Sequence, residues 1–174
     1  MKSEEEKYIM RKDNRNTLTG RNYQKDFRCR SYMNYLDFSI KELNRNGYTF
    51  YATDGNRSFS STERGVKPLL DLIDSAVSLS GCSAADKVVG RAAAFLYVRL
   101  KVSELHASIM SEPALEVFQQ YGIPVSYDQL VKVIFNRTLT GLCPMESSVL
   151  GITDAEEAEA AIRRKLASLR EQAE

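Results

Sequence analysis

Residues 106–122 read HASIMSEPALEVFQQYG and predict a strand that runs directly into a helix. We expect the strand over 104–110 and the helix from the following residues to about Tyr121, with Gly122 as its C-terminal stop. Ligand sites of α/β proteins lie where strands end and helices begin. The junction Met110-Ser111-Glu112-Pro113 is therefore the first place to look for a functional site.

A helix and a β-hairpin are predicted between residues 36 and 61. Leu36, Ile40 and Leu43 repeat at helical spacing, and Gly47 follows where a helix should stop. The stretch YTFYATDGNRSFSS then contains two short β-prone runs around Asp54-Gly55, which predicts a β-hairpin.

Two further helices are predicted between residues 65 and 100. GVKPLLDLIDSAVSLSG indicates a helix that opens at Pro68 and closes near Gly81. CSAADKVVGRAAAFLYVRL indicates a longer helix in which Ser83 and Asp86 have the spacing of a capping box. Gly90 would lie inside this helix, on a slim side that packs very close to the sheet.

The C-terminal third continues the alternation of strands and helices. IPVSY predicts a strand, DQLVKVIF favours a short helix, and NRTLTGLCPME is typical of a loop. A last helix starts with a Thr153/Glu156 capping box. The whole pattern predicts an α/β fold: a three-layer α/β/α domain with a mixed central sheet.

Composition and charge limit the classes of protein to consider. The 174 residues are 43% hydrophobic and carry a net charge of +1, with three widely spaced cysteines. A packed core is expected, and the overall charge makes no case for nucleic acid or an anionic membrane. Because no long apolar run and no secretory signal are present, we expect a cytoplasmic protein with no membrane partner.

The first 34 residues differ from the rest. Residues 1–34 hold nine Lys or Arg and five acids, so we expect a basic N-terminal arm, flexible or loosely docked, before a domain over 35–174. The alternative is an arm that binds nucleic acid, with aromatic rings for stacking on bases. Those rings are Tyr8, Tyr23, Phe27 and Tyr32.

Five motifs carry a resemblance to a known family. ERGVKPLLDLID, ADKVVGRAAA, MSEPALEVF, GIPVSYDQLV and NRTLTGLCPME resemble, in order and spacing, the bacterial and archaeal family called domain of unknown function 1893, over residues 35–160. The resemblance implies a cytidine-deaminase-like fold, in a family without an assigned activity.

The zinc chemistry of true deaminases does not carry over. Their ligands lie in a His-Ala-Glu or Cys-Ala-Glu turn that opens one helix and in a Pro-Cys-x-x-Cys that opens the next. By chain order these places correspond to Ala85-Asp86-Lys87 and Ser111-Glu112-Pro113, which contain no His or Cys. A Cys82/His106/Cys143 set lacks the deaminase spacing. We therefore expect no metal and no cofactor, and not a zinc-dependent deaminase.

What remains at the two predicted helix starts favours an anionic ligand. Free backbone N–H groups at helix N-termini attract anions, Lys87 adds a cation, and Ser111 adds a hydroxyl. Asp86 and Glu112 also sit there, and carboxylates are stabilised at such ends without any ligand. The alternative is that both acids only cap their helices and that Lys87 pairs with one of them.

Further candidates come from the loops. Arg64, at the end of the hairpin, and Asn136-Arg137, at the start of the late loop, offer groups that can hold phosphate or carboxylate. A structural Glu63–Arg137 or Arg64–Glu146 ion pair is the alternative. Cys143 lies near Glu146 as a nucleophile lies near an acid, but no histidine is close in sequence, and a packed, inert thiol is the competing interpretation.

The leading hypothesis is a metal-free relative of nucleotide deaminases that binds a small nucleotide-like or phosphorylated ligand. Its site candidates are Arg64, Asp86, Lys87, Ser111, Glu112, Asn136, Arg137, Cys143 and Glu146. One rival is an enzyme with non-zinc chemistry that uses Asp86, Lys87, Glu112 or Cys143. Another is an RNA-binding or interaction protein that acts through the N-terminal arm. The sequence is also compatible with a homo-oligomer.

Overall fold

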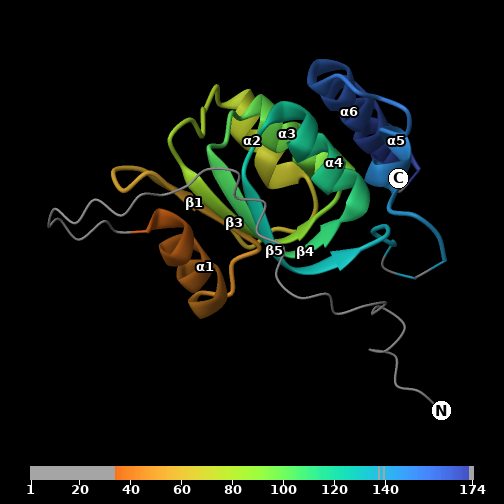
Figure 1. The fold of residues 1–174 in the computed structure, drawn as a ribbon. Helices are drawn as coiled ribbons and strands as arrows, with labels where there is room; N and C mark the ends of the chain where they lie inside the picture. The colour runs from red at the N-terminus through yellow and green to blue at the C-terminus, as the bar shows by residue number, and fades with distance from the viewer. Residues whose placement is uncertain (1–33, 137, 139, 173–174) are drawn as a thin grey trace, which may run out of the picture.

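The computed structural model describes residues 34–136, 138 and 140–172. Within them, a five-stranded sheet with strand order β2-β1-β3-β4-β5 lies between helices (Figure 1). The strands are β1 Phe50–Thr53, β2 Ser58–Ser61, β3 Ser83–Val89, β4 Glu104–Ser111 and β5 Val125–Val131. The helices are α1 Tyr35–Arg45, α2 Lys67–Asp74, α3 Arg91–Arg99, α4 Glu112–Tyr121, α5 Pro144–Ser148 and α6 Ala155–Glu171.

The sheet is mixed, as the sequence predicts. β1 pairs antiparallel with β2 and with β3, whereas β3, β4 and β5 are parallel to one another. The predicted hairpin is confirmed, because the Asp54 carboxylate accepts hydrogen bonds from the backbone N–H groups of Asn56 and Arg57 and closes the turn. The carboxyl ends of the three parallel strands consequently lie at one edge of the sheet.

Three layers result. In Figure 1, α1 covers one face of the sheet, whereas α2, α3 and α4 cover the other, with α5 and α6 beyond them. The predicted three-layer α/β/α fold is thus confirmed. Arg99 holds α6 to α3 through Glu159, with an Nε–Oε2 distance of 2.9 Å, and Arg163 holds α6 to Asp74 of α2.

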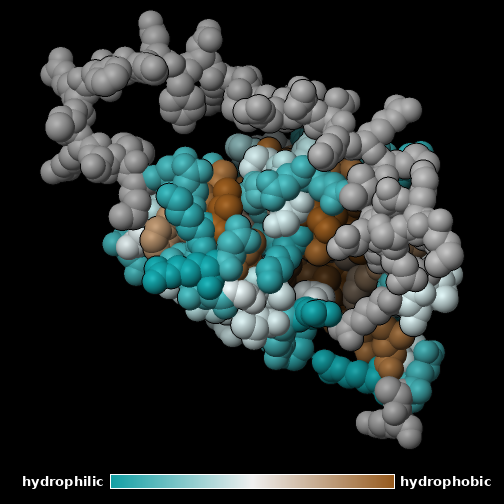
Figure 2. Space-filling view, turned by 90° about the horizontal axis from the view of Figure 1, so that it is seen from below, coloured by the Kyte–Doolittle hydropathy of each residue, from teal (hydrophilic) through white to brown (hydrophobic). Residues whose placement is uncertain are grey.

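The main core fills the space between the sheet and the α2–α4 layer. Its large side chains are fully buried, and each contributes roughly 1.5–3 kcal/mol through its removal from water. The largest are Tyr97, Phe95, Phe118, Leu69, Leu79, Leu96, Leu100, Leu105, Met110, Ile162 and Val89. From below, apolar residues form separate patches among polar ones on the visible part of the surface (Figure 2).

The predicted helix over residues 83–100 is wrong in its first half. Residues Ser83–Val89 form strand β3, and α3 begins only after Gly90, which is its N-cap. The apolar spacing that suggested one helix crosses the junction of a strand and a helix. β3 lies between β1 and β4, so two hydrogen-bonded ladders outweigh the helical preference of Ala84 and Ala85.

Smaller boundary errors occur elsewhere. The predicted short helix at DQLVKVIF is wrong, because Asp128–Val131 extends β5 as the parallel neighbour of β4 and residues 132–135 form no helix. The predicted loop NRTLTGLCPME is shorter than expected, since α5 begins at Pro144. α2 ends at Asp74 rather than near Gly81.

Helix ends are set mostly by local caps. Asp154, not Thr153, caps α6 by accepting hydrogen bonds from two backbone N–H groups. Gly122 ends α4 with a positive φ of 68°, which glycine adopts without strain, as predicted. Asn34 caps α1, so it belongs to the folded domain; the rest of the predicted arm, residues 1–33, lies outside the described residues.

In the described part of the chain, no helix combines the length and apolarity that a membrane crossing requires.

Candidate functional site

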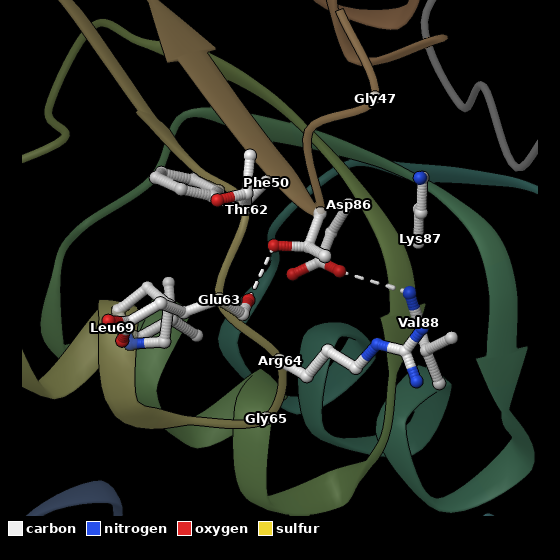
Figure 3. Close-up of a pocket in the computed structure, with 12 residues that line it drawn as sticks. Gly47, Phe50, Thr62, Glu63, Arg64, Gly65, Leu69, Asp86, Lys87 and Val88 are labelled. Carbon is white, nitrogen blue, oxygen red and sulfur yellow. Dashed lines mark hydrogen bonds between the residues drawn. The ribbon is translucent and has the colours of Figure 1, made fainter.

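A cavity of about 450 Å³ opens where β3 ends, beside the connection from β2 to α2 (Figure 3). Its lining comes from the turn into β1, from the β2–α2 connection and from the last part of β3. Phe50, Leu69 and Val88 give it apolar walls, and Arg64, Asp86 and Lys87 give it charge. Ligands of open α/β sheets bind in this position, beyond the carboxyl ends of the parallel strands.

Two acids line this cavity: Glu63, which pairs with Lys67, and Asp86. Oδ2 of Asp86 accepts a hydrogen bond of 2.6 Å from the Tyr97 hydroxyl, and its Oδ1 accepts one of 3.0 Å from the backbone N–H of Val88. Burial raises the pKa of Asp86 to about 6, although the hydrogen bonds from Tyr97 and from the backbone act in the opposite direction. The carboxyl group therefore changes its charge close to neutral pH.

Arg64 and Lys87 are the cations of the cavity, and they lie differently. In Figure 3, Arg64 extends past Asp86 and brings its guanidinium beside Val88, whereas Lys87 points away from the Asp86 carboxylate. Successive residues of a strand point to opposite faces, which explains the divergence of Asp86 and Lys87. Across the part of the chain that the structure describes, neither cation forms an ion pair with an acid.

The predicted structural partners of these groups are not the ones observed. Glu63 pairs with Lys67 at 2.9 Å, and among the described residues Arg64 forms no ion pair with Glu146. Arg137 lies outside the described residues. The expected pair between Lys87 and Asp86 is likewise replaced by the hydrogen bond between Tyr97 and Asp86.

The first turn of α2 borders the same cavity. Gly65, Pro68 and Leu69 line it, and no side chain caps the start of this helix at Val66. Free backbone N–H groups at a helix start carry partial positive charge and favour an anion. The cavity thus combines an uncapped helix start with Arg64, whose guanidinium has no acid partner within the described part of the chain.

The start of α3 is occupied by the protein's own carboxylate. Glu146, on α5, is 8% exposed, and it accepts hydrogen bonds of 2.9 Å from the backbone N–H of Arg91 and of 3.1 Å from that of Ala92. A Cβ atom on Gly90 would collide with this carboxylate. Gly90 therefore serves the approach of Glu146; the predicted role, inside a helix pressed against the sheet, is wrong.

The start of α4, where the argument from sequence began, is also satisfied internally. The Ser111 hydroxyl is fully buried and accepts a hydrogen bond of 3.2 Å from the backbone N–H of Ala114. Glu112 occupies the first turn of the helix and does not line the cavity. The predicted shared pocket between Ser111 and a helix start at Asp86 is wrong, because Asp86 lies within a strand.

The remaining candidates lie away from the cavity. Asn136 closes a turn by accepting a hydrogen bond from the backbone N–H of Thr140. Cys143 is the N-cap residue of α5 and is partly buried. His106 lies on β4, with Nδ1 3.0 Å from the Ser126 hydroxyl. Within residues 34–136, 138 and 140–172, no three His, Cys, Asp or Glu side chains gather as metal ligands.

Sequence reasoning placed Arg64, Asp86 and Lys87 among the candidates, and the structure brings them to one cavity. Sequence reasoning did not single out Tyr97 or Val88. Tyr97 sits eleven residues after Asp86, and only the turn at Gly90 folds α3 back so that its hydroxyl reaches the strand. A correct strand assignment for ADKVVG, from its two adjacent valines followed by glycine, could have found this pair.

Comparisons with known proteins agree on one family. Residues 39–166 match the family described as Domain of unknown function (DUF1893). The crystal structure of a DUF1893 family protein from Thermotoga maritima is similar, with a TM-score of 0.70 and 33% sequence identity over 78% of this chain and 90% of that one. No curated protein matches the chain.

Proposed function

The chain belongs to the DUF1893 family, and from its cavity beside Asp86 we propose that it binds a small phosphorylated, nucleotide-like ligand. The observation that carries the proposal is a single cavity that is lined both by Arg64, which has no acid partner among the described residues, and by the uncapped first turn of α2. Guanidinium groups hold phosphate oxygens through two parallel hydrogen bonds, and helix starts add further N–H donors.

The contrast among three helix starts supports a ligand at the start of α2. Glu146 caps the start of α3 and Ser111 caps the start of α4, so a side chain of the protein already accepts from backbone N–H groups at both. The start of α2 has no such cap and opens into a cavity with apolar walls at Phe50 and Val88. An apolar wall beside a cationic rim suits a ligand with a flat or apolar part and a phosphate.

A cytidine-deaminase-like, metal-free fold is part of the same proposal. It rests on the resemblance of the five motifs, and the antiparallel hairpin followed by parallel strands and alternating helices supports it. The helices that follow β2 and β3 begin with Lys67-Pro68 and Arg91-Ala92, so neither start offers a thiolate or imidazole to zinc.

One observation favours a second candidate function, an enzyme with non-zinc acid–base chemistry. A carboxyl group with its pKa raised to about 6 can take up and release a proton near neutral pH, and Asp86 faces the cavity. Conversion of any bound ligand, lost in Asp86→Asn while binding persists, would support catalysis.

The binding proposal is tested by thermal shift and calorimetry with a panel of nucleoside phosphates and sugar phosphates. We expect Arg64→Ala to weaken binding about tenfold or more, as for the loss of a charge-assisted hydrogen bond. Arg164→Ala, an exposed arginine on α6, is the matched control and should bind as the parent does. Silence of the unmodified protein across the panel would overturn the proposal.

Lys87→Ala separates a ligand contact from a structural role. Since Lys87 has no acid partner among the described residues, its removal should change the free energy of unfolding by no more than about 0.5 kcal/mol. Binding should weaken less than in Arg64→Ala, because the lysine points away from Asp86. A large loss of stability with unchanged binding would assign Lys87 to the fold alone.

A further inference from the structure

Asp86 has acceptor capacity that the protein does not use. A carboxylate can accept about four hydrogen bonds, and the Tyr97 hydroxyl and the Val88 N–H account for two of them. The side chain is partly exposed, and the exposed part faces the cavity. A donor that enters the cavity therefore finds free lone pairs on a negatively charged group.

The negative charge of Asp86 is not explained by packing. The Tyr97 hydroxyl is fully buried and needs an acceptor, but a neutral amide oxygen would serve that purpose without the cost of burying a charge. Phe50, opposite Asp86 on β1, and Ala107, opposite it on β4, bring no cation to it. A charge retained in such surroundings is typical of a functional group rather than a structural one.

The position of Asp86 relative to Arg64 limits which part of a ligand it can contact. Both side chains line the same cavity, so a ligand whose phosphate contacts Arg64 can present a neighbouring group to Asp86. In a nucleotide or sugar phosphate, the group one step from the phosphate is the sugar. Its adjacent hydroxyls are two donors that suit the two oxygens of a carboxylate.

We propose, on the basis of the ligand site proposed above, that Asp86 selects a sugar phosphate or ribonucleotide by accepting hydrogen bonds from its adjacent sugar hydroxyls. Tyr97 is the positioning residue, because its hydroxyl fixes one oxygen of the Asp86 carboxylate and leaves the outer lone pairs for the ligand. In this site Arg64 binds the phosphate of the ligand and Asp86 recognises its sugar.

A dependence on pH follows from the charges around Asp86. Tyr97 from α3 bonds the Asp86 carboxylate, and Arg64 from the β2–α2 connection lines the same cavity. Lys87 lines it too but points away from Asp86, and the Glu63 carboxylate pairs with Lys67. Since the pKa of Asp86 is about 6, hydroxyl recognition should be complete above that pH and should weaken as the pH falls through it. Removing the Tyr97 hydroxyl should raise this pKa further, because that hydrogen bond favours the charged carboxylate.

The test measures the affinities of adenosine 5′-monophosphate and of its 2′,3′-dideoxy analogue by calorimetry between pH 5 and pH 8. The phosphate titrates near pH 6 in both probes, so the ratio of the two affinities isolates the hydroxyls. We expect the parent protein to prefer the ribonucleotide about tenfold or more above pH 7, with the preference lost at low pH. Asp86→Asn should bring the ratio close to one at every pH.

Tyr97→Phe should still prefer the ribonucleotide at high pH. As the pH is lowered, this variant should lose the preference sooner than the parent protein, at a higher pH. Tyr121→Phe is the matched control, because its hydroxyl bonds the Thr153 carbonyl oxygen far from the cavity, and it should leave the profile unchanged. Ribose 5-phosphate should be bound with the same dependence on Asp86 as the ribonucleotide, since the adenine is not part of the contact.

The failures of the two proposals are distinguishable. If the parent binds neither nucleotides nor sugar phosphates, the proposed ligand site is wrong. If it binds them through Arg64 with equal affinity for both probes, or with a preference that survives Asp86→Asn, the site stands and the role of Asp86 is wrong. If Asp86→Asn does not fold, an unmoved profile in Tyr97→Phe overturns the role by itself.

Discussion

Two carboxylates that are largely removed from water lie on the helical side of this protein, and they differ in what surrounds them. Asp86, near the end of β3, faces a cavity and accepts one hydrogen bond from the Tyr97 hydroxyl and one from the backbone N–H of Val88. Glu146, on α5, is closed over the start of α3 and accepts from two backbone N–H groups. Burial raises the pKa of both carboxyl groups.

The difference teaches how a buried acid is to be interpreted. Glu146 satisfies donors that would otherwise be orphaned, so its charge has a structural use that is complete within the chain. Asp86 satisfies a hydroxyl that does not need a charge, and its remaining lone pairs face open space. The pKa of both groups is raised, and the geometry around each one separates a structural acid from a candidate ligand contact.

The largest expected effect is the loss of the structural acid. Glu146→Ala should lower the free energy of unfolding by about 2–4 kcal/mol, because two buried N–H groups lose their acceptor. Chemical denaturation measures the change. Glu116→Ala is the control, since that exposed carboxylate lies 3.7 Å from Arg91 and should contribute little. A loss below 1 kcal/mol for Glu146→Ala would remove the contrast between the two acids.

A second substitution tests the same contact from the other side. Gly90→Ala should destabilise the protein by about 1–3 kcal/mol, since its Cβ must displace the Glu146 carboxylate from α3. In the Glu146→Ala background most of this loss should disappear, which gives a coupling of about 1–2 kcal/mol in a double-mutant cycle. Additive losses would show that Gly90 is required for a different reason.

Neutralising Asp86, the cavity acid, should stabilise the protein, whereas removal of Glu146 should destabilise it. Asp86 has a higher pKa in the folded protein than its ordinary value of 3.8, so the proton that it binds stabilises the fold at low pH, and this contribution is lost as the pH rises through about 6. Asp86→Asn should therefore raise the free energy of unfolding by about 1–2 kcal/mol at pH 7. The gain should vanish near pH 4.

Thermal unfolding of Asp86→Asn and the parent at both pH values decides this prediction. A destabilised variant at pH 7 would mean that the charge of Asp86 supports the fold, as that of Glu146 does.

The smallest expected change in stability comes from the loss of Asn34, a neutral cap next to its own helix, in contrast to Glu146, which caps α3 from α5. Asn34 caps α1 with hydrogen bonds to the backbone N–H groups of Leu36 and Asp37, of 3.1 and 3.3 Å. Removal of residues 1–34 should cost about 1 kcal/mol more than removal of residues 1–33. Equal melting temperatures of the two truncated chains would show that this cap adds nothing measurable.

Much of the fold follows from local sequence. The hairpin at Asp54-Gly55, the strand and helix around Ser111, and the final helix are each marked by residues whose preference agrees with the structure. β3 could not be recognised in this way, because Ala84 and Ala85 favour a helix and become a strand only through pairing with β1 and β4. Contacts distant in sequence decided that element.

The same limit applies to the site. Arg64, Asp86 and Lys87 were expected at a ligand site because two helix starts were expected to meet there, but Asp86 and Lys87 lie on a strand and the helix start beside them is that of α2. Glu146 was expected to contact a ligand because it is an acid in a predicted loop. In the structure its position makes it the cap of α3. The sequence around Glu146 gives no local sign of the helix that this carboxylate will contact 55 residues away.

That separation has a consequence during protein synthesis. Ribosomes add roughly 5–20 residues per second, so about 3–11 seconds pass between the synthesis of Arg91 and that of Glu146. For that interval the nascent chain carries the start of α3 without its acceptor, and water or cellular anions must serve instead. A message cut short before α5 would yield a chain that keeps every strand of the sheet and never closes this helix end.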